Sequence, residues 1–396
     1  MNNKILTALT LILFISVTLT AQTNEANEAY INAITASNPN QQAKLLKDYI
    51  AKYAGKRTQY ENFVYANLCI IPYSDKTAKE LMDYGEKALA LGGLDDFTKC
   101  QVLINVSGIY SQRGQNLEKA KNYSLQVVQI AKANKNKETT ATTPTQWNKF
   151  MGAGYLIHGQ ALEKLKDPRG ALKSYTNSYN ILKDPQIAKS MKRIGKTLYD
   201  FKFYKDAEKA FKIPASTLKD FGSYAYYAKS LYKNKKKEEA LKYFKKAYAK
   251  QRSGEIAFFA GVILVEKAKS DSSISQEAIE FLLDASFLSA ANSKKAMALA
   301  ESLFFTSNKE LKYNEKVKEL QKRSKKLEEI TSSFNKKFGD KDEEDLSYAE
   351  IKRMKALLAD IESEKKAIQK LEADQKDALA QFNKLIEETK QRLGIK

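Results

Sequence analysis

Residues that interrupt helices are scarce in this chain, which has only 6 prolines and 16 glycines among 396 residues. Few segments show the turn residues and the alternation that mark strands and hairpins. Long stretches rich in Ala, Leu, Lys, Glu and Tyr suit helices instead. Because 43% of the residues are apolar and 29% are charged, the chain can bury a large core and lacks the composition of a disordered protein. We predict an all-α fold.

Residues that serve catalysis or bind transition metals are scarce too. The chain has one histidine, His158, and two cysteines, Cys69 and Cys100, which offer little to a transition metal. It has no glycine-rich phosphate loop, nucleophile elbow or Asp-rich calcium loop. His158 lies beside Gly159 in a predicted helix, which favours a packing or surface role. We expect no catalytic, cofactor-binding or metal-binding residue; an enzyme that acts through His158 or Asp200 is a third alternative.

The N-terminus has the layout of a secretory signal peptide over residues 1–21. Lys4 is followed by an apolar run at residues 5–19 and then by Thr20-Ala21-Gln22. A run of this length is short for a membrane span, which needs about 20 residues. We expect cleavage near Gln22 and a mature chain without a transmembrane span. Its expected location is the periplasm or the outside of the cell, with association to the envelope as a further option.

The formal charge is +20 and the pI is about 9.4, which by itself suggests nucleic-acid binding. Export argues against a nucleic-acid partner. Outside the cytoplasm a basic surface meets anionic lipid headgroups, acidic glycans or acidic protein segments. A solvated lysine-rich surface that keeps the protein soluble is the simpler interpretation.

A twelve-residue spacing recurs along the chain, with a small residue followed by alanine. A fixed period of this kind is typical of repeat proteins. In the best-defined copy, Tyr224, Tyr227 and Leu231 lie in a first amphipathic helix, and Phe244 and Ala247 extend the apolar stripe of a second. The five spaced pairs are Ala66 and Ala78, Gly108 and Ala120, Gly159 and Ala171, Gly195 and Ala207, and Ala228 and Ala240.

These segments resemble the tetratricopeptide repeat (TPR) family, whose first helices carry large apolar, small and aromatic residues and whose second helices carry Ala, aromatic and small residues. The resemblance implies a right-handed superhelix, or α-solenoid, of about five to six helix-turn-helix repeats over residues 55–308, with a sixth unit at 255–288. A helical pair over residues 22–54 would cap the array. The Thr-rich segment at residues 134–146 reads as a long connection.

Two details of the repeats lead to further predictions. Pro214 falls inside the second helix of the fourth repeat and is expected to shorten it. The repeat alignment separates Cys69 and Cys100 by about 16 Å along neighbouring helices, beyond the roughly 7 Å that a disulfide allows between Cα atoms. We predict two free, buried thiols.

From residue 309 to residue 396 the pattern changes to long charged helices with a sparse apolar seam. A polar break at residues 338–345 would separate a shorter helix from a longer one. We favour an antiparallel helical hairpin or coiled coil that projects from the array or self-associates with a second copy; a single helix in solvent is the alternative. The heptad a positions are Met354, Ile361, Ile368, Gln375, Phe382 and Thr389, and the d positions are Leu357, Glu364, Leu371, Ala378, Leu385 and Arg392.

The resemblance also implies that the first helix of each repeat lines a groove for a peptide or helix. The first two repeats would present Tyr60, Phe63, Asn67, Val102, Asn105 and Ile109. The fourth and fifth would present Lys189, Lys192, Lys196, Tyr199, Lys229, Tyr232 and Lys233.

Lysines among tyrosines suit an acidic peptide, which charge attracts and the rings pack against. Lysine is common throughout the chain, so lysines at these positions are also expected without a ligand. We expect an exported scaffold or adaptor that binds a protein or peptide, with no cofactor. The alternative is a structural, envelope-associated protein whose basic surface docks on anionic lipid or glycan.

Overall fold

The computed structural model describes residues 24–56, 58–139, 142–339 and 341–395, and all regular elements in these ranges are helical, as predicted. The predicted signal peptide lies outside the described residues. The chain divides into two compact units. We call Met1–Lys219 the N-terminal unit and Asp220–Lys396 the C-terminal unit, and each is described by itself.

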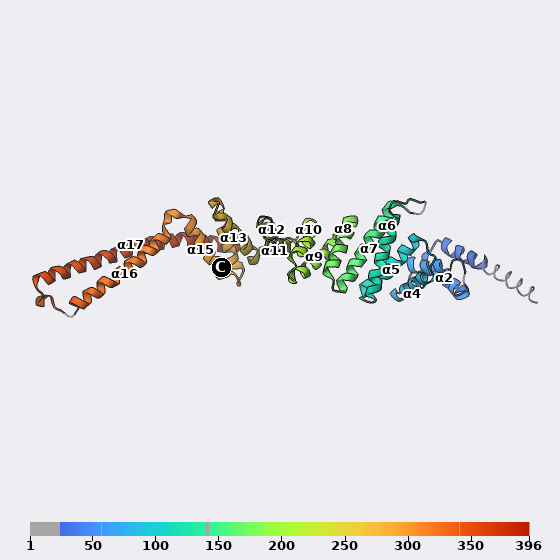
Figure 1. Ribbon diagram of the computed structural model, residues 1–396, viewed down its shortest axis with the longest axis horizontal. Helices are drawn as coiled ribbons and strands as arrows, with labels where there is room; N and C mark the ends of the chain where they lie inside the picture. Colours follow the sequence, from blue (N-terminus) through green and yellow to red (C-terminus); the bar gives the residue numbers. More distant parts are fainter. Residues whose placement is uncertain (1–23, 57, 140–141, 340, 396) are drawn as a thin grey trace, which may run out of the picture. The chain divides into compact units, whose positions relative to one another are not determined.

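The N-terminal unit consists of consecutive helices that pack on their neighbours in sequence (Figure 1). A helix over residues 24–35 precedes the break that we predicted at Asn38-Pro39. First helices α3, α5 and α7 also contact one another in turn, as in a solenoid. The later helices are α2 (Pro39–Tyr53), α3 (Glu61–Ile70), α4 (Ala78–Leu91), α5 (Asp96–Arg113), α6 (Leu117–Asn134), α7 (Pro144–Lys164), α8 (Pro168–Leu182), α9 (Pro185–Asp200) and α10 (Tyr204–Thr217).

A three-residue turn explains the twelve-residue spacing. In the third and fourth repeats the helices of a pair are joined by residues 165–167 and 201–203. The middle residues, Lys166 and Lys202, have φ of 64° and 62°, in the left-handed region that reverses a helix end. The third residue of each turn then donates its N–H back into the first helix, from Asp167 to Leu162 and from Phe203 to Leu198, both at 2.9 Å.

Two of our predictions about the repeats were wrong. Ala78 does not belong to the spacing, because α3 and α4 are joined by the seven residues 71–77 and Ala78 is the first residue of α4. Gly85 and Ala88 are the buried small residues of that helix. Pro214 does not shorten α10, which continues to Thr217 with Pro214 buried inside it. Pro214 has no N–H to donate to the Ala210 carbonyl, so one intrahelical bond is lost. The bonding resumes after it, because the Leu218 N–H donates to the Pro214 carbonyl at 2.8 Å.

Four of the six prolines begin helices. Each stands at the first helical position, where a missing N–H costs nothing, and follows a residue whose side chain accepts a bond from the first turn. These starts are Asn38-Pro39, Thr143-Pro144, Asp167-Pro168 and Asp184-Pro185.

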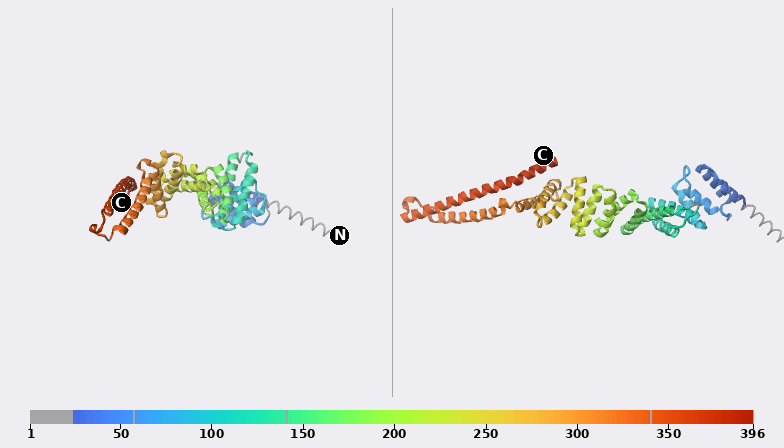
Figure 2. Two further views of the ribbon diagram at one scale, coloured as in Figure 1. Left: turned by 60° about the vertical axis from the view of Figure 1, so that its left-hand side comes forward. Right: turned by 90° about the horizontal axis from the view of Figure 1, so that it is seen from above.

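The C-terminal unit continues the helical pairs and ends in an antiparallel hairpin of two long helices (Figure 2). The sixth pair that we predicted is present as α13 and α14. The elements are α11 (Phe221–Lys233), α12 (Lys237–Lys250), α13 (Gly254–Ala268), η1 (Ser272–Ile274), α14 (Ser275–Leu288), α15 (Ser293–Ser307), η2 (Lys309–Leu311), α16 (Tyr313–Phe338), η3 (Glu343–Asp345) and α17 (Tyr348–Leu393).

The heptad positions of the hairpin match the buried face of α17. Its buried residues are Ile361, Glu364, Ala378, Phe382 and Thr389, and all five occupy predicted a or d positions. Beyond α16 the helix continues onto the repeat pairs, where Ala378 and Phe382 join one apolar cluster with α13, α14 and α15. The end of α17 thereby covers the apolar face that the last pairs would otherwise expose.

Three other features of the chain bear on our predictions. Cys69 and Cys100 are free and buried, as predicted, and burial raises the pKa of Cys69 to about 11 and that of Cys100 to about 12. The connection from α6 to α7 is long and includes the Thr-rich segment. Within the described ranges, no helix has both the length and the apolar character needed to cross a membrane.

Candidate partner-binding groove

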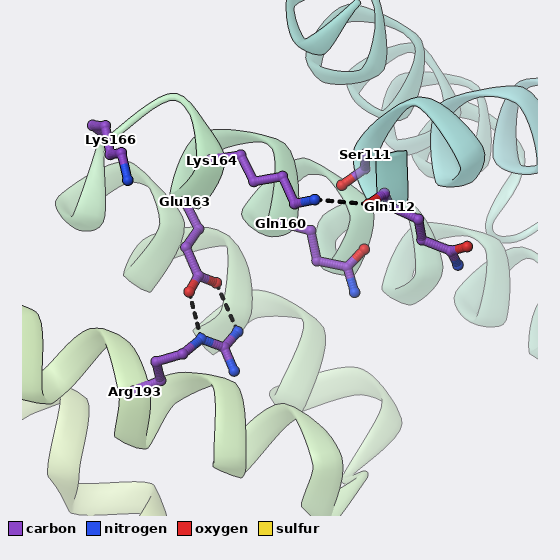
Figure 3. A pocket seen from close by; sticks show the side chains of 7 residues that line it. All are labelled: Ser111, Gln112, Gln160, Glu163, Lys164, Lys166 and Arg193. Carbon is purple, nitrogen blue, oxygen red and sulfur yellow. Dashed lines mark hydrogen bonds and ion pairs between the residues drawn. The ribbon is translucent and has the colours of Figure 1, made fainter. Parts of the chain in front are cut away.

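A pocket of about 470 Å³ lies between the first helices of the second, third and fourth repeats, all in the N-terminal unit (Figure 3). Two of its residues come from α5, three from α7, one from the turn after α7 and one from α9. It is lined by Ser111, Gln112, Gln160, Glu163, Lys164, Lys166 and Arg193.

The repeat register places these side chains on one surface. Gln112 and Glu163 each follow the small residue of their own first helix, Gly108 and Gly159, by four positions, which is about one helical turn. Arg193 belongs to the next first helix and reaches Glu163 across the pocket (Figure 3). The pocket therefore lies on the surface of the first helices, where the resemblance implies a groove.

A fixed carboxylate forms one wall of the pocket. Glu163 accepts two bonds from Arg193, from Nε at 2.5 Å and from a terminal nitrogen at 2.8 Å, and a third from the Tyr175 hydroxyl at 2.6 Å. Burial acts to raise the pKa of Glu163, but these donors outweigh it and hold the pKa below the usual 4.5. The charge of Arg193 is thus largely neutralised within the pocket.

The opposite side of the pocket carries donors. The Lys164 ammonium group donates to the Gln112 carbonyl at 2.8 Å and keeps further N–H groups for another acceptor. Lys166 is exposed at the turn. The Ser111 hydroxyl is buried and has no hydrogen-bond partner among the described residues, which is costly for a polar group unless water or a ligand satisfies it. The two lysines therefore offer their donors to the open side of the pocket, and the Ser111 hydroxyl does not.

Positive charge is concentrated around this pocket. Residues 144–219, which form the third and fourth repeats, contain 15 Lys and Arg against 6 Asp and Glu, a net charge of +9. Residues 22–143 contain 15 against 12, a net of +3. The basic surplus of the N-terminal unit therefore belongs mainly to the repeats that supply most of the pocket residues, where it favours an anionic segment.

Four of the predicted groove residues extend this surface along α9. Lys189 and Lys196 are exposed, and Lys192 and Tyr199 are half-buried. Lys189 and Lys196 lie one turn before and about one turn after Arg193, so they share its side of the helix. Tyr199 packs edge-on against Tyr204 at 5.3 Å. A role of these residues in partner binding stays a prediction.

The other three predicted residues lie in α11 of the C-terminal unit, where they have contacts within that unit. Lys229 pairs with Glu255 at 2.7 Å and lies over the Tyr226 ring. Tyr232 packs against Phe244 and Phe259. Lys233 is exposed.

Some of the residues that we expected the first two repeats to present in the groove are covered by other helices. Val102 is completely buried and lies beside Gly85 of α4. Tyr60 stacks on Tyr30 of the N-terminal helix at 4.6 Å, and the Asn67 amide donates to the Tyr30 hydroxyl at 3.2 Å. The N-terminal helix therefore covers part of the groove of the first repeat.

Our predicted groove residues included none from the third repeat. Gln160, Glu163 and Lys164 follow Gly159 by one, four and five positions, as Lys196, Tyr199 and Asp200 follow Gly195. The same register would have found them. His158, in the same helix, is half-buried and forms a hydrogen bond with Ser174 of α8 at 2.8 Å. Among the described residues, no group of three or more His, Cys, Asp or Glu is arranged to hold a metal ion.

The helix pairs, their short left-handed turns and the buried small residues are those of a TPR-type α-solenoid fold, as predicted. No protein-family model and no curated protein matches the chain.

Solved structures similar to the chain include a tetratricopeptide repeat protein from Parabacteroides merdae, with 14% identity over 70% of this chain and 98% of that one and a TM-score of 0.34. The apo form of RapI has 14% identity over 82% and 99%, with a TM-score of 0.33. A complex of the TPR2AB domain of yeast Sti1 with pHSP90 has 16% identity over 57% and 92%, with a TM-score of 0.25.

Proposed function

We propose that this chain is an exported scaffold that binds an acidic segment of a partner protein in the groove of α5, α7 and α9. The observation that carries the proposal is the pocket itself. Its one carboxylate is engaged by Arg193 and Tyr175, while Lys164 and Lys166 retain donors. Carboxylate side chains accept the strongest hydrogen bonds from ammonium donors, because both groups are charged, and main-chain carbonyls accept from them as well.

The groove carries amide side chains and a tyrosine beside its lysines, which supports a protein ligand over a free ion. The amides of Gln112 and Gln160 line the pocket beside the lysines, and amides both donate to and accept from an extended backbone. Tyr199 adds an aromatic surface about one turn beyond Lys196. A segment of several residues uses these groups together, whereas a small anion uses only the cations.

The partner is sought with the mature protein in native envelope extract at two salt concentrations, with retained proteins identified by mass spectrometry. The groove variant is Lys164→Glu/Lys196→Glu. The control variant, Lys173→Glu/Lys212→Glu, makes the same charge change on exposed positions of the second helices α8 and α10.

The proposal requires a partner that the wild type and the control variant retain and the groove variant loses. The acidic segment of that partner, made as a peptide, should then bind the wild type at least about tenfold more tightly than the groove variant. Equal retention by all three proteins would refute the groove. Equal loss in both variants would indicate attraction by net charge alone.

Export is proposed from residues 1–21 and has its own test. The intact mass of the protein recovered from envelope and medium fractions should correspond to a chain that begins at Gln22. A mass that includes residues 1–21 would contradict cleavage and leave the apolar run as an anchor.

A further inference from the structure

The connection between α16 and α17 carries the most acidic segment of the chain. Asp342, Glu343, Glu344 and Asp345 are consecutive, and the sequence has no other run of more than two acidic residues. All four are exposed. Residues 341–350, which we call the acidic tip, contain five carboxylates and one lysine, a net charge of −4.

Most of this charge is not neutralised within the hairpin. Lys341 pairs with Glu350 at 3.8 Å, and Lys355 of α17 pairs with Glu343 at 3.1 Å. The other three residues of the acidic run form no ion pair with any residue that the structure describes. Their carboxylates repel one another and are available to cations of another molecule.

The acidic run is not needed to close the hairpin, because apolar contacts on both sides of it do so. Phe338 and Leu346 are buried. Tyr348, which follows shortly after the run, is 85% exposed, the highest fraction among the large hydrophobic residues of the described chain. The tip lies at the end of the hairpin that is remote from the repeat pairs of the same unit (Figure 2). It therefore projects as a preorganised acidic loop with one free aromatic ring.

The groove of α5, α7 and α9 has the complementary chemistry. Lys164 and Lys166 offer donors to the open side of the pocket, whereas its one carboxylate, Glu163, is engaged by Arg193. The third and fourth repeats carry a net charge of +9, which attracts the −4 of the tip. Tyr199, further along α9, provides a ring against which an aromatic side chain can pack.

We propose that the acidic tip of one copy of this chain binds in the groove of a second copy. The inference rests on the proposed function and identifies the acidic segment as residues 341–350 of the same chain. Because the tip and the groove are different surfaces, the contact is heterologous. Each copy can then engage one neighbour through its tip and another through its groove, so the chain assembles head to tail.

Sedimentation of the full mature chain over a concentration series measures the assembly. The wild type should form species that grow with concentration, and less so at about 0.5 M salt than at about 0.1 M. The tip variant Asp342→Asn/Glu344→Gln/Asp345→Asn removes three charges with little change in shape and keeps the pair of Glu343 with Lys355. It should associate at least about tenfold more weakly than the wild type.

A matched control separates the position of these charges from their number. The hairpin control variant Asp360→Asn/Glu372→Gln/Asp377→Asn makes the same charge change on exposed positions of α17 and should assemble like the wild type. Circular dichroism verifies that each variant keeps its helicity. Equal weakening in the tip variant and the hairpin control variant would show an effect of net charge and would overturn the inference.

Mixing the tip variant with the groove variant Lys164→Glu/Lys196→Glu provides the decisive measurement. Each variant lacks one of the two surfaces, so neither should assemble alone. The mixture should form a one-to-one complex and nothing larger, because one intact tip and one intact groove remain. Assembly by the groove variant alone, or a mixture that forms no complex, would overturn the inference.

A synthetic peptide of residues 341–350, blocked at both ends, distinguishes this inference from the proposed function. The peptide should bind the wild type at least about tenfold more tightly than the groove variant and should dissolve the assemblies. A wild type that stays monomeric throughout the series overturns the contact between copies, even if the peptide binds. The proposed function then stands if a protein from the envelope extract still requires the groove. If neither the peptide nor any such protein requires it, both are refuted.

Discussion

At the residue scale, the small residues of the repeats differ in how tightly they are packed. The sequence marked Gly108 and Gly159 as equivalent positions of close helix approach. A Cβ at Gly108 would meet nothing nearer than Ile157 Cδ1 at 3.8 Å, whereas a Cβ at Gly159 would lie 2.8 Å from the ring of Tyr175. The sequence spacing identifies the small residue of each repeat. Whether an added Cβ fits there depends on the side chain that packs against it from the neighbouring helix.

Gly108→Ala and Gly159→Ala should therefore have opposite effects. Alanine at position 108 gains helix propensity without a clash and should stabilise the fold by about 0.5–1 kcal/mol. At position 159 it would displace the fully buried Tyr175, and overpacking of this kind costs about 1–3 kcal/mol. Guanidinium unfolding midpoints of the two variants and the wild type measure the difference. Stabilisation by both alanines would mean that Tyr175 moves freely.

Glu163 should make stability depend on pH. Its pKa in the folded chain is below 4.5, so the ionised form is stabilised by folding. That contribution is complete above the ordinary pKa and is lost as the pH falls through the lower folded pKa. Glu163→Gln should cost about 1–2 kcal/mol at neutral pH. The difference from wild type, from urea unfolding at several pH values, should shrink below about pH 4.5; a difference that is constant down to pH 3 would contradict the assignment.

At the element scale, the hairpin shows what sequence patterns can and cannot supply. The heptad register predicted the inward face of α17, because the period of apolar residues directly determines which face is buried. In the sequence, the polar residues Glu364 and Arg392 at d positions interrupt the apolar seam of that face. In the structure Glu364 bonds Arg323 and Lys326, and Arg392 bonds Asp284. These partners are 38 to 108 residues away in the sequence, so no local pattern indicates them.

The same contrast holds in the repeat array. The spacing of small residues predicted the helix pairs. It did not predict that Tyr30 covers Tyr60, or that a seven-residue connection between α3 and α4 places Gly85 and Ala88, and not Ala78, in the core. The repeat register contains the pocket residues of the third repeat, but it does not show that Arg193 of the next repeat pairs with Glu163.

Arg392 should hold the end of α17 on the repeat pairs. Its guanidinium group donates to both oxygens of Asp284, at 3.0 and 2.5 Å, and Asp284 is almost fully buried. Arg392→Met keeps the apolar stem but leaves a buried carboxylate with only the Tyr248 hydroxyl, at 2.6 Å, at a cost of about 1.5–3 kcal/mol. Hydrogen exchange should accelerate in the last turns of α17, after Phe382, and not in α16.

A second change separates charge from packing at this contact. Asp284→Asn in the Arg392→Met background removes the unpaired charge and should recover part of the lost protection. If exchange in α17 is unaffected by Arg392→Met, the apolar cluster around Phe382 alone holds the helix.

At the scale of the whole molecule, the formal charge of +20 permits two kinds of recognition. A surface attraction depends on the total charge and on ionic strength, because exposed charges are screened within about 10 Å at 0.1 M salt. Binding in the groove depends on where the charges lie and on contacts that salt does not screen. The uneven distribution, with +9 on residues 144–219, makes these alternatives distinguishable with variants of equal net charge.

Vesicles with anionic headgroups test the surface alternative directly. The mature protein should bind them weakly and lose that binding steeply as the salt concentration rises. The groove variant Lys164→Glu/Lys196→Glu and the control variant Lys173→Glu/Lys212→Glu should bind more weakly than the wild type by the same factor, because both change the net charge by the same amount. Co-sedimentation over a salt series measures this. Binding that persists at about 0.5 M salt, beyond the reach of screened attraction, would instead make the envelope surface a specific ligand. In that case the acidic peptide and the vesicle would compete for the groove, and a loss confined to the groove variant would identify the shared site.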